Sequence, residues 1–572
     1  MKRTELKNLI SIAAGNKKAD LVLKNCSIIN VLTSEIVEGD IAIYNGKIAG
    51  IGDYTGEKEI DVEGKFIAPG FIDGHVHIES SMASPSQFAK AIVPRGTTTI
   101  IADPHEIANV SGTDGIKYIL DDSENIPLDV YIMLPSCVPA TPFENSGANL
   151  KAGDLRELID HERVLGLGEL MNYPGVINGD EEVLDKILLA KGKKIDGHGP
   201  LINDSQLNAY IAAGISTEHE CSTVEEMKNR LRLGMYILIR EGSAAKNLKE
   251  LIKGVNKENL NRCLFCTDDK HPDDILSDGH INYNIKLAMK EGMDPIDAVK
   301  MATINGAECY GLKDRGAIAP GYIADLVVID NLEDFNILKV FKGGKMVGED
   351  YNPLFEVSST DTLKVENSVN IKKLTLKDLD IELKSNSANV IKLFSHSLFT
   401  EKVEREVEVK DGKFTFGQED ILKVAVVERH NGTGNIGLGL VENFGLKGGA
   451  IASTIAHDSH NIIAIGDSDE DILKAIEEIE KIGGGITIVS NKKVLKSLPL
   501  PIAGLMSEDS LEKINDKFKE MLSIAYKELG VNSEIDPFMT LSFIALPVIP
   551  ELKITDMGLF DVSKFKFVDI SN

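Results

Sequence analysis

The sequence predicts an α/β protein built around a closed (β/α)8 barrel of the TIM type, with a small flanking β-sandwich and a C-terminal α+β domain. Short apolar strands alternate with helical segments from His75 to about Gly311, and β-rich runs lie on both sides of that region. A polar stretch at 357–361 precedes a third region of mixed strands and helices. The 572 residues exceed what one hydrophobic core organises. We expect residues 1–66 and 319–355 to form the sandwich, 67–318 the barrel, and 366–572 the last domain.

The composition excludes some classes of partner. Lys and Arg number 62 against 89 Asp and Glu, a formal charge of −27, which repels nucleic acid and anionic membranes. No apolar run approaches the ~20 residues that span a bilayer, and the N-terminal apolar stretch is too short for a signal peptide. The six cysteines have no disulfide-framework spacing, which favours the cytoplasm. We expect Cys263 and Cys266 to be core residues.

Each part of the predicted fold follows from a local pattern. Turn residues separate short β-rich runs at 20–24, 27–32, 40–44 and 47–52, and strands at 324–330, 337–341 and 345–347 would complete that sheet. The barrel strands are the run before His75 and 97–102, 128–134, 164–168, 194–196, 214–217, 235–239 and 262–267. Helices are predicted at 181–190 and 223–233, the latter capped by Ser222 with Glu225 or Glu226. The rival is an open doubly wound sheet, but no Gly-x-Gly-x-x-Gly follows the first strand.

Polar residues at the predicted strand ends form a set of metal ligands. His75 and His77 alternate on the first strand, so both imidazoles point the same way. Chemistry in such barrels gathers at the C-terminal strand ends. Later strands deliver further donors there: Glu169, His198, His219 and Asp268. Four imidazoles and two carboxylates at one rim suit two divalent first-row metal ions with a bridging carboxylate.

The run Pro-Gly-Phe-Ile-Asp-Gly-His-Val-His at 69–77, the later ligands and the flanking sheet resemble the amidohydrolase superfamily of metal-dependent hydrolases. The segments at 102–109, 164–172 and 456–461 further resemble the bacterial-type adenine deaminases. That resemblance implies purine salvage, in which a metal-activated hydroxide converts the free base adenine to hypoxanthine and ammonia. It implies manganese or iron as the metal, with zinc as a third candidate. Many dinuclear relatives carry a carboxylated lysine where this chain has Glu169, so occupancy by a single ion stays open.

Several side chains receive hypothetical roles. Asp268 is placed to take the proton of the attacking water, Glu169 to bridge the ions, and His105 to orient substrate or shuttle protons. Glu79, Ser80 and Glu241 are candidates for binding the purine. The alternatives are a solvated loop for the first two and an ion pair for the third.

Other functions remain open at this point. The same ligands would serve a hydrolase of cyclic amides or N-acyl groups, and a catalytically silent barrel scaffold is a third reading. His457 and His460 have the spacing of a second metal site but no strand-end carboxylates. We therefore expect the C-terminal region to cap the barrel mouth or to help form the interface of a homo-oligomer, a dimer or larger.

Overall fold

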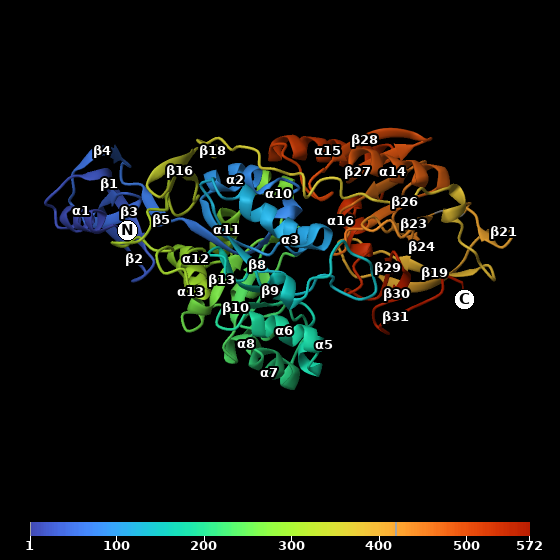
Figure 1. Cartoon of the computed structure of the whole chain (residues 1–572). Helices are drawn as coiled ribbons and strands as arrows, with labels where there is room; N and C mark the ends of the chain where they lie inside the picture. Colours follow the sequence, from blue (N-terminus) through green and yellow to red (C-terminus); the bar gives the residue numbers. More distant parts are fainter. Residues whose placement is uncertain (1, 418–419, 572) are drawn as a thin grey trace.

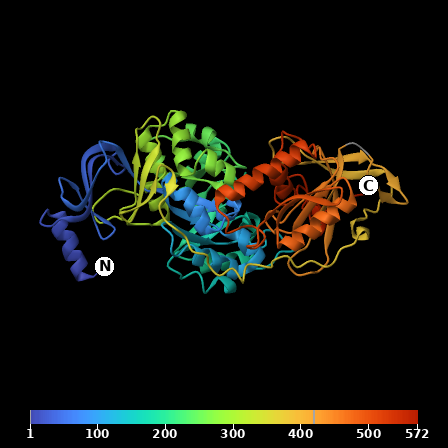
Figure 2. The same cartoon turned by 90° about the horizontal axis from the view of Figure 1, so that it is seen from above.

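The chain forms three parts arranged in a row, with the termini at opposite ends of the molecule (Figures 1 and 2). The computed structural model describes residues 2–417 and 420–571. A small sheet lies at one end, the barrel in the middle and the C-terminal part at the other end. Within the described ranges, no helix has both the length and the apolar composition needed to cross a bilayer.

The predicted (β/α)8 barrel is confirmed. Its strands are β6 (Phe71–His77), β7 (Thr97–Ala102), β8 (Asp129–Leu134), β9 (Val164–Leu170), β10 (Lys194–Gly197), β11 (Thr217–Glu218), β12 (Tyr236–Arg240) and β13 (Cys263–Cys266), extended by β14 (Asp268–Asp269). Neighbouring strands pair in parallel, and β14 pairs with β6 to close the ring on one side. On the other side, the Ser216 amide donates to the Ile195 carbonyl at 3.1 Å and joins β10 to β11. The open doubly wound sheet is therefore wrong.

Helices cover the outside of the barrel, because each crossover must pack its apolar face on the strands. They are α2 (Pro85–Ile92), α3 (His105–Asp122), α4 (Ala152–Leu155), α5 (Tyr173–Asn178), α6 (Glu181–Leu189), α7 (Asp204–Ala212), α8 (Val224–Arg232), α9 (Leu248–Leu251), α10 (Pro272–Ser277), α11 (Ile281–Lys290), α12 (Pro295–Met301) and α13 (Ile304–Tyr310), with 3-10 turns η1 (Ile78–Ser81), η2 (Val93–Arg95), η3 (Ile252–Gly254) and η4 (Leu260–Arg262). The predicted cap of α8 is wrong by one residue. Thr223 is the N-cap and accepts from the Glu226 amide, while Ser222 donates to the Glu226 carboxylate.

Segments from both sides of the barrel share one sheet, as predicted. The earlier elements are α1 (Arg3–Ala13), β1 (Ala19–Asn30), β2 (Glu35–Tyr44), β3 (Lys47–Gly52), β4 (Gly56–Asp61) and β5 (Phe66–Pro69), and the later ones β15 (Leu326–Ile329), β16 (Ile337–Lys342), β17 (Lys345–Glu349) and β18 (Asn352–Pro353). Strand β5 pairs with β1 on one side and with β15 on the other. Apolar side chains from both segments, including Leu23, Ile41 and Phe341, fill a common core.

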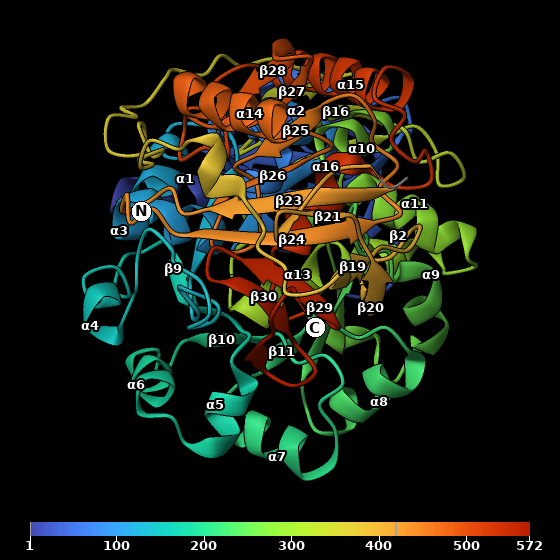
Figure 3. The same ribbon diagram turned by 90° about the vertical axis from the view of Figure 1, so that its right-hand side faces the viewer.

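The C-terminal part is built on an eight-stranded sheet with strand order β20-β19-β24-β23-β26-β25-β27-β28 (Figure 3). Its elements are η5 (Leu376–Leu379), β19 (Ser387–Lys392), β20 (Glu401–Glu406), β21 (Val409–Lys410), β22 (Lys413–Phe414), β23 (Ile421–Val427), β24 (Ile436–Glu442), β25 (Ala450–Ser453), β26 (Ile462–Gly466), α14 (Asp469–Ile482), β27 (Gly485–Ser490), β28 (Lys493–Pro499), α15 (Leu511–Lys527), α16 (Pro537–Ile544), β29 (Leu552–Thr555), β30 (Gly558–Asp561) and β31 (Lys566–Phe567).

The C-terminal part sits beside the barrel strand that carries the histidine pair. The Ser507 amide donates to the Met82 carbonyl, and the Ser84 amide donates to the Ser507 carbonyl, both at 2.9 Å. Met82 directly follows η1, which itself follows β6. The C-terminal part is thus anchored at the rim where the predicted ligands lie.

Candidate metal centre

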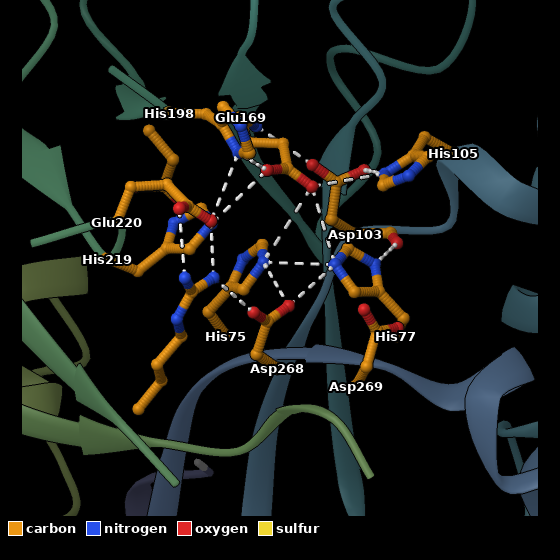
Figure 4. Close-up of polar contacts among 12 residues, drawn as sticks. His75, His77, Asp103, His105, Glu169, His198, His219, Glu220, Asp268 and Asp269 are labelled. Carbon is orange, nitrogen blue, oxygen red and sulfur yellow. Dashed lines mark hydrogen bonds and ion pairs between the residues drawn. The ribbon is translucent and has the colours of Figure 1, made fainter. Parts of the chain in front are cut away.

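The six predicted ligands converge at the C-terminal ends of the barrel strands (Figure 4). Glu169 lies at the end of β9, and its carboxylate contacts several of the imidazoles. Its Oε2 lies 2.6 Å from His198 Nδ1 and 3.2 Å from His219 Nε2. Its Oε1 lies 3.3 Å from His77 Nε2. The two oxygens of one carboxylate therefore face two different groups of imidazoles.

Asp268 completes the other side of the centre. Its Oδ1 lies 3.2 Å from His77 Nε2 and 3.7 Å from His75 Nε2. Five of the six ligands are buried, and His198 is partly exposed. This donor set of imidazole nitrogens and carboxylate oxygens is typical of divalent first-row metals.

The hydrogen bonds of the histidines indicate that the centre is built for a cation. His77 Nδ1 lies 2.9 Å from the Asp103 carbonyl, which can only accept, so Nδ1 carries the proton and Nε2 presents a lone pair. That lone pair lies 3.2 Å from His75 Nε2 and close to two carboxylate oxygens. A cation between these atoms turns the mutual repulsion of lone pairs into coordination, so the residues fit a metal.

Asp103, at the end of β7, is a supporting residue that sequence reasoning gave no role. Its carbonyl orients His77, and its Oδ2 accepts from the Glu169 amide at 2.8 Å. A Cβ atom at Gly168 would lie 2.0 Å from the same Oδ2, so only glycine permits this approach. The signal was available, because Asp103 directly follows a predicted strand.

Arg240, the last residue of β12, was also missed. Its guanidinium donates to Asp268 Oδ2 at 2.8 Å and to Glu220 Oε2 at 2.9 Å. Burial opposes its positive charge, but Glu220 and Asp268 outweigh burial and raise the pKa of Arg240 above its usual range. Arg240 thus holds one oxygen of Asp268 and leaves the other facing the imidazoles.

His105, the predicted proton shuttle or substrate-orienting residue, lies beside the candidate centre. It begins helix α3, and its Nδ1 lies 3.3 Å from Glu169 Oε1 and 3.6 Å from Asp103 Oδ1. Both His105 Nδ1 and Asp103 Oδ1 are buried without a hydrogen-bond partner. Both atoms are therefore available to a hydrogen-bond donor or an ion beside Glu169.

The three predicted substrate residues have different surroundings. Glu79 accepts from the Ile107 amide at 3.1 Å, and burial raises its pKa to about 7. Ser80 donates to Asp269. Both Glu79 and Ser80 line a cavity between η1 and the C-terminal part. The Glu241 carboxylate instead accepts from the Leu248 amide at 3.2 Å, at the start of α9.

The fold and the site together define a metal-dependent hydrolase of the β/α-barrel type. Comparison with known proteins narrows the class. The Amidohydrolase family model matches residues 66–347, and the Adenine deaminase C-terminal domain model matches residues 397–566. "Adenine deaminase" of Clostridium acetobutylicum is 56% identical, covering 98% of this chain and 99% of the relative. "Adenine deaminase 2" of Carboxydothermus hydrogenoformans is 53% identical, covering 99% of each.

These similarities extend through all three parts of the molecule. A third relative, "Adenine deaminase" of Nitratidesulfovibrio vulgaris strain DP4, is 50% identical and likewise covers 99% of each chain. The protein belongs to the adenine deaminase family, whose barrel is of the amidohydrolase type. The resemblance found in the sequence is confirmed.

Proposed function

We propose that the protein hydrolyses adenine to hypoxanthine and ammonia. The choice of adenine as the substrate rests on sequence similarity. About half of all residues are identical to those of curated adenine deaminases along the whole chain, including the C-terminal part. The ligand geometry supports the reaction type. The two alternatives, a hydrolase of cyclic amides or N-acyl groups and a silent scaffold, are not favoured by these relatives.

The ligands divide into two groups around Glu169. His75, His77 and Asp268 would hold one ion, His198 and His219 the other, and Glu169 would be shared by both. Divalent ions bound there lower the pKa of water towards neutrality and so supply a nucleophile.

Asp268 is the proposed acceptor of the water proton. Arg240 fixes its Oδ2 at 2.8 Å, so Oδ1 stays turned towards the centre, where water would attack C6 of the purine. The proton then passes to N1 or to the amino group, the bond between C6 and the amine breaks, and ammonia leaves. His105 Nδ1, facing the same region, is a second proposed proton-handling group.

The activity test loads the purified protein with manganese or iron and follows ammonia and ultraviolet-detected products from adenine, adenosine, cytosine and hydantoin. We expect hypoxanthine from adenine and no release of ammonia from the other compounds. Ring opening of hydantoin without adenine turnover would replace the proposal with the cyclic-amide alternative. The same preparation, reconstituted with manganese, iron or zinc, compares the three candidate metals, of which we propose manganese or iron.

We also propose that the protein works in the cytoplasm. All six cysteines are buried as free thiols, which is the state that a reducing compartment maintains. Fractionation of the source cells, followed by immunoblotting, would test the compartment.

A further inference from the structure

A cluster of one glutamate and two histidines joins the barrel to the C-terminal part. Glu106 lies in the first turn of α3, while His457 and His460 lie in the segment between β25 and β26. His457 Nδ1 lies 2.7 Å from Glu106 Oε1, and His460 Nε2 contacts Glu106 Oε2. All three residues are at least nine-tenths buried. More than 350 residues of chain separate the partners, so the contact exists only through the docking of the two parts.

The three side chains also have the composition of a metal site, but the hydrogen bonds favour another role. The Ala456 amide donates to His460 Nδ1 at 3.2 Å, so Nδ1 carries the lone pair. In a neutral imidazole the proton then resides on Nε2. An Nε2–H group donates a hydrogen bond to Glu106 and has no lone pair for a cation. The cluster is therefore a carboxylate held by two imidazole donors.

Glu106 in turn holds a residue of the metal centre. Its Oε1 lies 3.3 Å from His105 Nε2. A carboxylate at this place favours a proton on Nε2, which leaves Nδ1 as the atom that faces Glu169 Oε1 at 3.3 Å. The buried and unpartnered His105 Nδ1 and Asp103 Oδ1 lie at the inner end of this chain of contacts.

We propose that His457 and His460 are positioning residues for the reaction of the metal centre, acting through Glu106 on the orientation of His105. The inference rests on the proposed function, since it assigns these residues to the deamination of adenine. It gives the C-terminal domain a part in catalysis, because the domain supplies the two hydrogen-bond donors that hold Glu106 against His105.

The test uses substitutions in the full-length, metal-loaded enzyme. At each histidine, one variant removes both the ring and its hydrogen-bond donor, and a second variant removes the ring but keeps a donor. In His460→Leu the donor is lost. In His460→Gln an amide nitrogen restores the donor to Glu106, while both variants lose the bond from the Ala456 amide. The pair His457→Leu and His457→Asn makes the same comparison at the other histidine, because an asparagine amide replaces Nδ1–H. Each pair therefore differs in donation to Glu106.

We expect the leucine variants to lose about 10- to 100-fold in kcat, the effect of removing a hydrogen bond to a charged group. We expect the KM for adenine and the metal content to stay unchanged, and the amide variants to remain within about threefold of the wild type. An unchanged kcat in the leucine variants would overturn the inference, as would amide variants as impaired as the leucine ones. If the wild type binds a metal ion in addition to those at the six ligands, and His460→Leu loses that ion, the cluster is a metal site and the inference is overturned.

Two further measurements test whether His457 and His460 act through His105. If His457 and His460 act through His105, the His460→Leu change has no further effect on kcat in a His105→Ala background, and additive losses would refute that path. In a crystal structure of His460→Leu, we expect the His105 ring to have turned, and an unmoved ring would refute the inference without reference to any substrate. If the leucine variants do not fold, Glu106→Gln carries the same expectations. A wild type that is inactive on adenine overturns the proposed function instead, and the ring position still decides the inference.

Discussion

The most direct perturbation of the proposed chemistry is Asp268→Asn. Arg240 can only donate, so in the variant the amide oxygen must turn towards it, which directs the amide NH2 towards the imidazoles. The centre thereby loses the oxygen that now lies 3.2 Å from His77 Nε2 and gains a donor that accepts no proton. General-base catalysis contributes roughly 10²- to 10⁴-fold. We therefore expect kcat to fall by that factor, an increase of about 3–5 kcal/mol in the activation barrier.

The assay measures initial rates of ammonia release from adenine, together with metal content by mass spectrometry and the thermal unfolding midpoint. The other five ligands remain, so we expect the variant to lose no more than one ion and to stay folded. Asp278→Asn, at the exposed C-terminal end of α10, is the matched control for removing one carboxylate and should leave kcat unchanged. A kcat within tenfold of the wild type would refute the role of Asp268 as proton acceptor. Loss of all metal would instead show that the residue acts as an essential ligand.

Three other predictions concern the bridge, its support and the stability of the C-terminal part. Glu169→Gln has one acceptor atom in place of two. Bound metal should therefore fall to one ion or fewer, and kcat should fall by more than about 100-fold. A variant that binds two ions and keeps full activity would contradict the bridging role of Glu169. Gly168→Ala should displace Asp103 and lower the free energy of unfolding by about 1–3 kcal/mol in urea, whereas Gly153→Ala, with open space around its Cβ position, should not. Burial lowers the pKa of Lys553 to about 7, below the ~10.4 of an unfolded lysine, so the unfolded chain binds more protons between these values. The free energy of unfolding should then rise between pH 7 and 10, by up to ~4 kcal/mol from this group, and Lys553→Met should flatten the rise in urea titrations at each pH.

The barrel and the convergence of the six candidate ligands were predictable, because both follow from local patterns. Apolar runs mark the strands, and a polar residue at the end of such a run lies at the functional rim. The same rule applied with the right strand end would have found Arg240. Side chains alternate along a strand, and Leu238 of β12 points into the barrel interior with Leu264, so Arg240 points inward as well. The sequence prediction placed the end of this strand one residue early and chose Glu241, whose carboxylate bonds the following loop.

Other features depend on contacts that no local pattern encodes. The spacing of His457 and His460 resembles a metal motif, and the missing carboxylate is Glu106, on a barrel helix far away in the sequence. Which nitrogen of His460 carries the proton depends on the Ala456 amide, whose direction is a property of the folded loop. The sequence predicts the flanking sheet and a C-terminal region that caps the barrel mouth or forms an interface. The histidine tautomers and the hydrogen-bond partners of Glu106 depend on the folded structure.

A chain of contacts leads from Glu169 to the C-terminal domain. Glu169 Oε1 faces both His77 of the metal centre and His105 of the supporting layer. His105 contacts Glu106, and Glu106 is held by His457 and His460 of the C-terminal domain. A barrel without that domain would keep all six ligands, yet Glu106 would lose two of its donors and face solvent. Its carboxylate could then rotate, and His105 would no longer have one favoured orientation beside the bridge. The six candidate ligands lie entirely within the barrel, whereas the proposed orientation of His105 beside Glu169 requires both domains.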